Sequence, residues 1–141
     1  MEPPIQARNM IVCRDVVHRS LDVEAPYTLI GVLCRMRPPD DFGYPVCAEA
    51  LCVYGELYGE PSIYRTRIVL FRIESEGAEP EAPVAVYNWT PSRVRAGAFV
   101  DGTRWRLPQV PFDTPGVYEF RLMLDGFDDP LASVRILLME V

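Results

Sequence analysis

The chain has 141 residues, 49% of them apolar, and a formal net charge of −6. Its 14 lysine and arginine positions are all arginine, which excludes reactions that need a lysine amine and phosphate binding by a P-loop lysine. The acidic balance predicts that the chain binds neither nucleic acid nor an anionic membrane, because both need a basic surface. Length and composition predict one globular domain, residues 1–141, with a flexible amino-terminal segment over residues 1–9.

No targeting or membrane-spanning segment is expected. The first residues lack a positive cluster followed by an apolar stretch, which a secretory signal requires. The longest apolar run, Val134 to Val141, is interrupted by Arg135 and Glu140, and a membrane span needs a longer uncharged stretch. We therefore expect a cytoplasmic protein.

Proline and glycine punctuate the chain at short intervals, and the segments between them alternate apolar and polar residues. This period of two is typical of strands, and helical spacing is rare without an intervening proline or glycine. The pattern predicts an all-β fold, namely a two-sheet antiparallel β-sandwich of about eight or nine strands with an immunoglobulin-like or C2-like arrangement. The expected strands are Met10 to Val17, Tyr27 to Arg37, Val46 to Tyr58, Ile63 to Glu74, Val84 to Trp89, Arg93 to Val100, Arg104 to Leu107, Val117 to Asp125 and Leu131 to Val141.

The four cysteines show no spacing typical of a zinc site or a disulfide framework. They are Cys13, Cys34, Cys47 and Cys52. The last two are five residues apart, so on one regular strand they would point to opposite faces. We interpret all four as small buried hydrophobic residues in a reducing compartment.

The single histidine, His18, follows Asp15 by three residues. On a strand the two side chains would lie on opposite faces, and no nucleophile has an obvious claim to pair with the imidazole. We interpret His18 as a surface residue at the end of a strand, and we expect no catalytic residue in the chain.

The clearest turn, Gly59 to Ser62, predicts a hairpin in which Tyr58 lies opposite Ile63. In this register the core face pairs Leu57 with Tyr64, Gly55 with Thr66, Val53 with Ile68 and Leu51 with Leu70. The opposite face is apolar away from the turn, and such a face usually marks an interface. The candidate interface residues are Ala50, Tyr54, Arg67, Val69, Phe71 and Ile73.

Arginine and tryptophan interleave over residues 89–106. The candidate ligand-binding residues are Arg93, Arg95, Arg104, Trp105 and Arg106. The first two arginines share one strand face and the last two share another, so each pair offers two guanidinium groups to a carboxylate or phosphate. The alternative is that the tryptophans fill the core while the arginines are solvated.

A second hairpin is predicted where Val117 to Asp125 meets Leu131 to Val141 through Gly126 to Pro130. Alternation along these segments predicts which side chains face inward. They are Tyr118, Phe120, Leu122 and Leu124 on the first strand and Val134, Ile136 and Leu138 on the second.

Aspartates cluster in two of the loops between expected strands. They are Asp40 and Asp41 in one loop, and Asp125, Asp128 and Asp129 in the other. If strand direction simply alternates, both loops lie at one end of the sandwich, where converging carboxylates would bind Ca²⁺. The alternative is ordinary turn chemistry, in which Asp lies beside Gly and Pro.

The order of strand and turn signals resembles an uncharacterised bacterial family of short, single-domain β-sandwich proteins. The segments that carry this resemblance are Tyr27 to Val32, Leu107-Pro108, Gly116 to Phe120, Leu124 to Gly126 and Ile136 to Leu138. The resemblance spans nearly the whole chain. It implies the fold, and it implies no catalytic residue and no function.

We therefore expect a non-enzymatic module without a cofactor, which binds another protein or associates with itself as a homo-oligomer such as a homodimer. The alternative is a small binding module, either for a metal ion at the aspartate loops or for an acidic ligand at the arginine and tryptophan segment. An enzyme is the third hypothesis.

Overall fold

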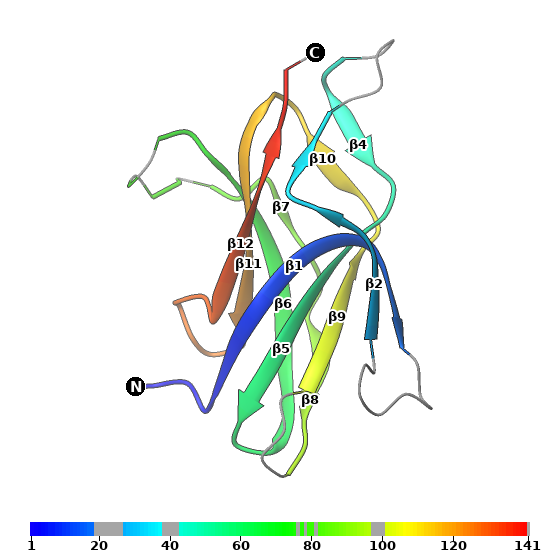
Figure 1. Cartoon of the computed structure of the whole chain (residues 1–141). Coiled ribbons are helices and arrows are strands. Elements are labelled where there is room, and N and C mark those ends of the chain that lie inside the picture. Colours follow the sequence, from blue (N-terminus) through cyan, green and yellow to red (C-terminus); the bar gives the residue numbers. More distant parts are fainter. Residues whose placement is uncertain are drawn as a thin grey trace.

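The computed structural model describes residues 1–18, 27–37, 43–75, 77, 79–80, 82–96 and 101–140. These residues form twelve strands in three sheets, almost all of them antiparallel (Figure 1). The predicted all-β class is confirmed. The strand order shows no clear immunoglobulin-like or C2-like topology. In addition to the two expected sheets there is a third, two-stranded sheet. In the described part of the chain no helix is long and apolar enough to cross a membrane.

The smaller of the two main sheets has four antiparallel strands. In spatial order they are β2 (Tyr27–Leu33), β1 (Ile5–His18), β5 (Leu51–Gly59) and β9 (Asp101–Leu107). The long strand β1 pairs with β5 along its first part and with β2 along its second part, and it bends between them (Figure 1).

The larger sheet is built on the β11–β12 hairpin and on β6. Its order is β3 (Arg35–Met36), β12 (Ala132–Leu138), β11 (Gly116–Leu124) and β6 (Ser62–Ile73), with β7 (Ala85–Val86) and β8 (Thr90–Val94) both paired to the free edge of β6. The third sheet joins β4 (Val46–Ala48) to β10 (Val110–Phe112).

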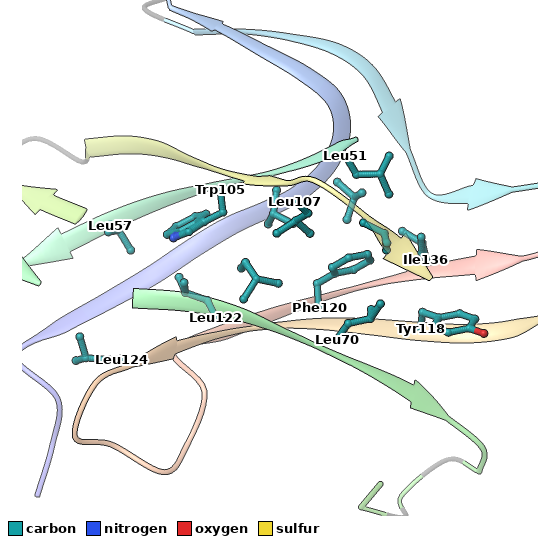
Figure 2. Packing of buried hydrophobic residues seen from close by; sticks show 14 of the residues in the cluster. Leu51, Leu57, Leu70, Trp105, Leu107, Tyr118, Phe120, Leu122, Leu124 and Ile136 are labelled. Carbon is teal, nitrogen blue, oxygen red and sulfur yellow. The ribbon is translucent and has the colours of Figure 1, made fainter. Parts of the chain in front are cut away.

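The core lies between the two main sheets (Figure 2). Leu70, Phe120 and Leu122 of the larger sheet face Leu51, Trp105 and Leu107 of the smaller one. Each fully buried side chain of this size contributes roughly 1.5–3 kcal/mol through removal of apolar surface from water. The alternation that predicted strands therefore has its physical cause here, because every second residue enters this layer.

Three polar groups inside the core satisfy one another. The Trp105 indole Nε1 donates to Thr66 Oγ1 at 2.9 Å, and the Thr66 and Ser92 hydroxyls lie 2.7 Å apart. All three residues are buried. This bonding allows Trp105 to occupy the core without leaving its N–H unpaired. Gly55 makes room for it, because a Cβ at that position would lie 3.2 Å from the Trp105 ring.

The predicted hairpin at Gly59 to Ser62 is wrong in its pairing, although the turn lies where it was expected. β5 joins the smaller sheet and β6 joins the larger one, so the turn carries the chain from one layer to the other. Both strands carry the apolar residues at alternate positions that the hairpin prediction used, but these residues face one another across the core. Leu57, Val53, Ile68 and Leu70 are all buried, as expected, by packing between sheets and not by pairing within one.

Two other expected strands are also divided between sheets. Tyr27 to Arg37 forms β2 and β3, and Val46 to Tyr58 forms β4 and β5. The sequence pattern did not show either crossing, which the structure marks by two consecutive exposed residues, Cys34 and Arg35 at the first and Glu49 and Ala50 at the second.

The segment 1–9, expected to be flexible, contributes Ile5–Asn9 to β1. Ile5 is fully buried and pairs with Gly59, which has φ +138° and approaches Pro4 so closely that a Cβ would lie 2.5 Å from its carbonyl oxygen. Asn9 has a positive φ beside an irregularity in the β1–β5 pairing. This bulge breaks the alternation and concealed the strand from sequence reasoning.

The β11–β12 hairpin is confirmed. Tyr118 pairs with Ile136 and Phe120 with Val134, and the four predicted inward residues of β11 are buried. Tyr118 also donates its hydroxyl hydrogen to Thr114 O at 2.8 Å and packs edge-on against Phe112, with ring centroids 4.9 Å apart. This tyrosine thus attaches the small β4–β10 sheet to the main core.

Candidate functional site

The aspartates proposed for Ca²⁺ do not form a cluster in the described structure. Asp40 and Asp41 lie outside the described residues. Asp125 accepts a hydrogen bond from Arg65 at 3.1 Å, and Asp128 and Asp129 are exposed in the β11–β12 turn. In the part of the chain that the structure describes, no three His, Cys, Asp or Glu side chains are placed to hold a metal ion. The Ca²⁺ site stays a prediction.

The arginine and tryptophan segment is divided between two hollows. Arg104, Trp105 and Arg106 line a cleft of about 430 Å³ beside Tyr87, whereas Arg93 and Arg95 line a separate one. The charged ends of the first two arginines are already engaged: Arg104 donates to Val16 O, and Arg106 pairs with Asp15 at 3.4 Å. The candidates therefore do not form one anion site.

The predicted interface residues also divide between two faces. Two belong to the smaller sheet, Tyr54 on β5 and Ala50 just before it. Four lie at alternate positions of β6 on the side of the larger sheet away from the main core, namely Arg67, Val69, Phe71 and Ile73. Val69 and Tyr54 are nevertheless buried. The six residues cannot form the single surface that the hairpin register implied. His18 ends β1, and its side chain lies outside the described part of the chain.

The cysteines also differ in their exposure. Cys13 and Cys52 are buried, as expected, but Cys34 and Cys47 are exposed. Cys34 falls where the chain crosses from β2 to β3, and Cys47 lies on the short strand β4. Few neighbouring residues cover a side chain at a crossing between sheets or on a short edge strand. The apolar sequence around Cys34 and Cys47 does not show that they occupy such positions.

The outer face of the larger sheet carries arginines stacked on aromatic rings. The guanidinium carbon of Arg67 lies 4.2 Å from the centroid of Trp89, and that of Arg65 lies 5.7 Å from it. On the next strand, Arg121 lies 4.4 Å from the centroid of Phe71. Trp89 is thus a surface residue that orients arginines, whereas Trp105 is a core residue.

Next to Phe71, Glu119 is a buried carboxylate held by two arginines. It accepts hydrogen bonds from Arg121 Nε at 2.6 Å and from Arg135 Nε at 3.0 Å. Burial by itself would raise the pKa of Glu119, but these hydrogen bonds and the two positive charges outweigh it and hold the pKa below its ordinary value. Arg121 also contacts Glu79 at 3.3 Å. At this end of the face, Glu119 and Glu79 therefore neutralise the charges of Arg121 and Arg135.

Arg67 differs from the other arginines of β6, β11 and β12. Those others pair with carboxylates: Arg65 with Asp125, Arg72 with Glu74, Arg121 with Glu119 and Glu79, and Arg135 with Glu119. No hydrogen bond or ion pair joins Arg67 to any described residue. Its Nε, like that of Arg72, is shielded from solvent and lacks an acceptor among the described residues, and a buried donor without an acceptor costs free energy.

Arg67 and Trp89 line a cleft of about 370 Å³. Its other lining residues are Met123, Leu124, Gly126, Phe127 and Asp128. An unpaired guanidinium on an aromatic wall, beside apolar side chains, suits a carboxylate attached to an apolar group. Sequence reasoning named Arg67 and Trp89 but did not bring them together. Arg65 and Arg67, two residues apart on a strand, were the available signal that one face is basic.

Comparisons with models of protein families, with curated proteins and with solved structures find no match to this chain. The resemblance to a bacterial β-sandwich family stays a prediction, and the functional argument depends on the residues of the chain itself.

Proposed function

We propose that the chain is a non-enzymatic binding module, and that the outer face of its larger sheet binds an acidic segment of another protein. The unpaired state of Arg67 carries this proposal. Because Arg67 is stacked on Trp89 and partly buried in the cleft, little of its rotamer freedom is left to lose on binding. A carboxylate would supply the acceptors that its guanidinium lacks, in the bidentate geometry that arginine favours.

Exposed apolar residues around the arginines define the rest of the partner's chemistry. Val86 on β7 and Leu137 on β12 are 50% and 43% exposed on this sheet, and Phe71 and Ile73 are partly exposed on β6. Arginine and tryptophan are also the residues most enriched at binding hot spots. The partner segment is therefore expected to place acidic residues beside apolar ones.

A second copy of the chain suits this face less well. A two-fold contact centred on the cleft would place Arg67, which pairs with no carboxylate among the described residues, near the Arg67 of the second copy. Like charges placed opposite one another oppose association. Self-association through Val69, Phe71 and Ile73 is therefore the competing hypothesis, and an acidic partner is the favoured one.

The test is a selection of random peptides displayed on phage against the purified chain, followed by fluorescence polarisation with the selected peptides. We expect sequences in which Asp or Glu flanks apolar residues. Arg67→Gln should weaken their binding at least about tenfold, because a hydrogen bond to a charged group contributes roughly 1.5–3 kcal/mol.

The matched control is Arg8→Gln. Arg8 is also stacked on an aromatic ring, Tyr58, but it already pairs with Glu56 and lies on the smaller sheet. Peptides that bind Arg67→Gln as well as wild type would contradict the proposal. Light scattering that shows a dimer, lost on Phe71→Arg, would favour self-association instead. A thermal-shift panel of small carboxylates, phosphate and Ca²⁺ tests the small-ligand alternative.

A further inference from the structure

Cys13 and Cys52 are direct cross-strand partners. Cys13 on β1 pairs with Cys52 on β5 in the antiparallel register of the smaller sheet. Side chains directly opposite one another in such a pair point to the same face. The chain therefore places two thiols side by side, although they are far apart in the sequence.

Both cysteines belong to a small hydrophobic cluster on the outer face of the smaller sheet. Val16 and Tyr54 complete its buried part, and Ile11 and Leu29 pack against it. Burial, with smaller contributions from the neighbouring Cys52 and Asp15, raises the pKa of Cys13 to about 11. The Cys52 pKa is also raised, chiefly by burial.

The backbone spacing of such a pair suits a disulfide. Directly opposed residues of antiparallel strands have Cα atoms about 4.5 or 5.5 Å apart, and disulfides span Cα separations of roughly 4.4–6.8 Å. The Cβ atoms of opposed residues lie about 4.5–5.5 Å apart, slightly farther than the roughly 3.5–4.5 Å that a disulfide prefers. A small approach of β1 towards β5 is enough to close the bond, and some strain would remain in it.

We propose that Cys13 and Cys52 are a redox-reversible pair, which a peroxide converts into a disulfide that joins β1 to β5. One thiolate attacks hydrogen peroxide, forming a sulfenic acid and releasing hydroxide, which takes up the thiol proton to give water. The second thiol then attacks the sulfenic sulfur and expels a second water. The two thiols lose two electrons and two protons in all, and a thiol reductant restores them by exchange.

The buried position sets the rate of this reaction. Only the thiolate is nucleophilic, and the raised pKa values keep both groups protonated near neutral pH. Oxidation therefore proceeds when the stretch of β1 around Cys13 moves locally away from β5. Once formed, the disulfide closes a loop of about 40 residues and restricts the unfolded chain, so the oxidised protein is expected to melt at a higher temperature.

The experiment uses the full chain with Cys34→Ser and Cys47→Ser, which removes the two exposed thiols. After treatment with hydrogen peroxide under native conditions, we expect a mass lower by two hydrogen atoms, loss of both free thiols, and a proteolytic fragment that links Cys13 to Cys52. The melting temperature should rise by several degrees and return after dithiothreitol.

Adding Cys52→Ser to the same background is the control, and it should show no loss of hydrogen. Three results would overturn the proposal: both thiols stay reduced in the folded protein, oxygen adducts form without a link, or the link appears only after global unfolding. The last result would show that the native register holds the sulfur atoms apart. A Cys13→Ala and Cys52→Val variant with wild-type stability would confirm that replacing the thiols does not unfold the sheet.

Discussion

The outer faces of the two main sheets both carry arginines, but they differ in whether each arginine has an acceptor within the described structure. On the smaller sheet, Arg104 and Arg106 reach across β5 to acceptors on β1, and Arg8 pairs with Glu56. On the larger sheet most arginines are paired too, but Arg67 makes no ion pair with a described residue, although Asp128 lines the same cleft. The difference shows that arginine on an aromatic ring is not itself a functional signal. The signal is an arginine that finds no acceptor among the described residues.

The largest effect is expected at the buried carboxylate of the larger sheet. Glu119→Gln should lower the free energy of unfolding by about 2 kcal/mol at pH 7, because it removes the charge that Arg121 and Arg135 share. Urea denaturation measures the change. A loss of stability as small as that of an exposed ion pair would mean that Arg121 and Arg135 do not hold the Glu119 carboxylate in the folded protein.

Measuring the stability of wild type and Glu119→Gln at several pH values is the control for this prediction. Because the folded-state pKa of Glu119 is lowered, its contribution is fully present above the unfolded-state pKa of about 4.3 and is lost as the pH falls through the folded-state value. The stability gap between wild type and Glu119→Gln should therefore narrow below about pH 4. A constant gap would attribute the effect to packing and not to charge.

On the smaller sheet, Arg104→Gln should cost about 1 kcal/mol, because it removes a donor from the carbonyl of Val16, a fully buried residue. Thermal or urea unfolding of the variant gives the value. Arg93→Gln is the matched control, since Arg93 is exposed on the edge strand β8 and should be near neutral. If the two substitutions lowered the stability equally, the hydrogen bond of Arg104 to Val16 would contribute no more than the solvated side chain of Arg93.

The smallest effect is expected at the proposed anchor. Arg67→Gln should lower stability by only about 0.5 kcal/mol, because it removes the cation–π contact with Trp89 but no hydrogen bond or ion pair to the described residues. Urea denaturation, read beside the peptide-binding assay, separates the two roles. A large loss of stability would show that Arg67 supports the fold through Trp89, and would weaken its assignment as a binding residue.

The candidate site illustrates what sequence reasoning reaches and what it misses. Alternation correctly predicted that Arg67, Val69, Phe71 and Ile73 share a face of one strand. It could not show that Trp89, which lies between two short strands, returns to that face. Nor could it show that Arg65 pairs with a carboxylate while Arg67 pairs with none among the described residues, because Asp125 comes from the turn after β11, far away in the sequence.

By itself the sequence determined the all-β class, the β11–β12 hairpin and the buried residues of β5, β6 and β11, because burial of every second side chain leaves a local pattern in the chain. The tertiary structure alone decided that β5 and β6 belong to opposite sheets, that Cys13 meets Cys52, and that Arg67 pairs with no carboxylate in the part of the chain that the structure describes. Period two is identical for two strands that pair side by side and for two that pack across a core. Partners far apart in sequence are therefore chosen by packing between layers, which no local pattern records.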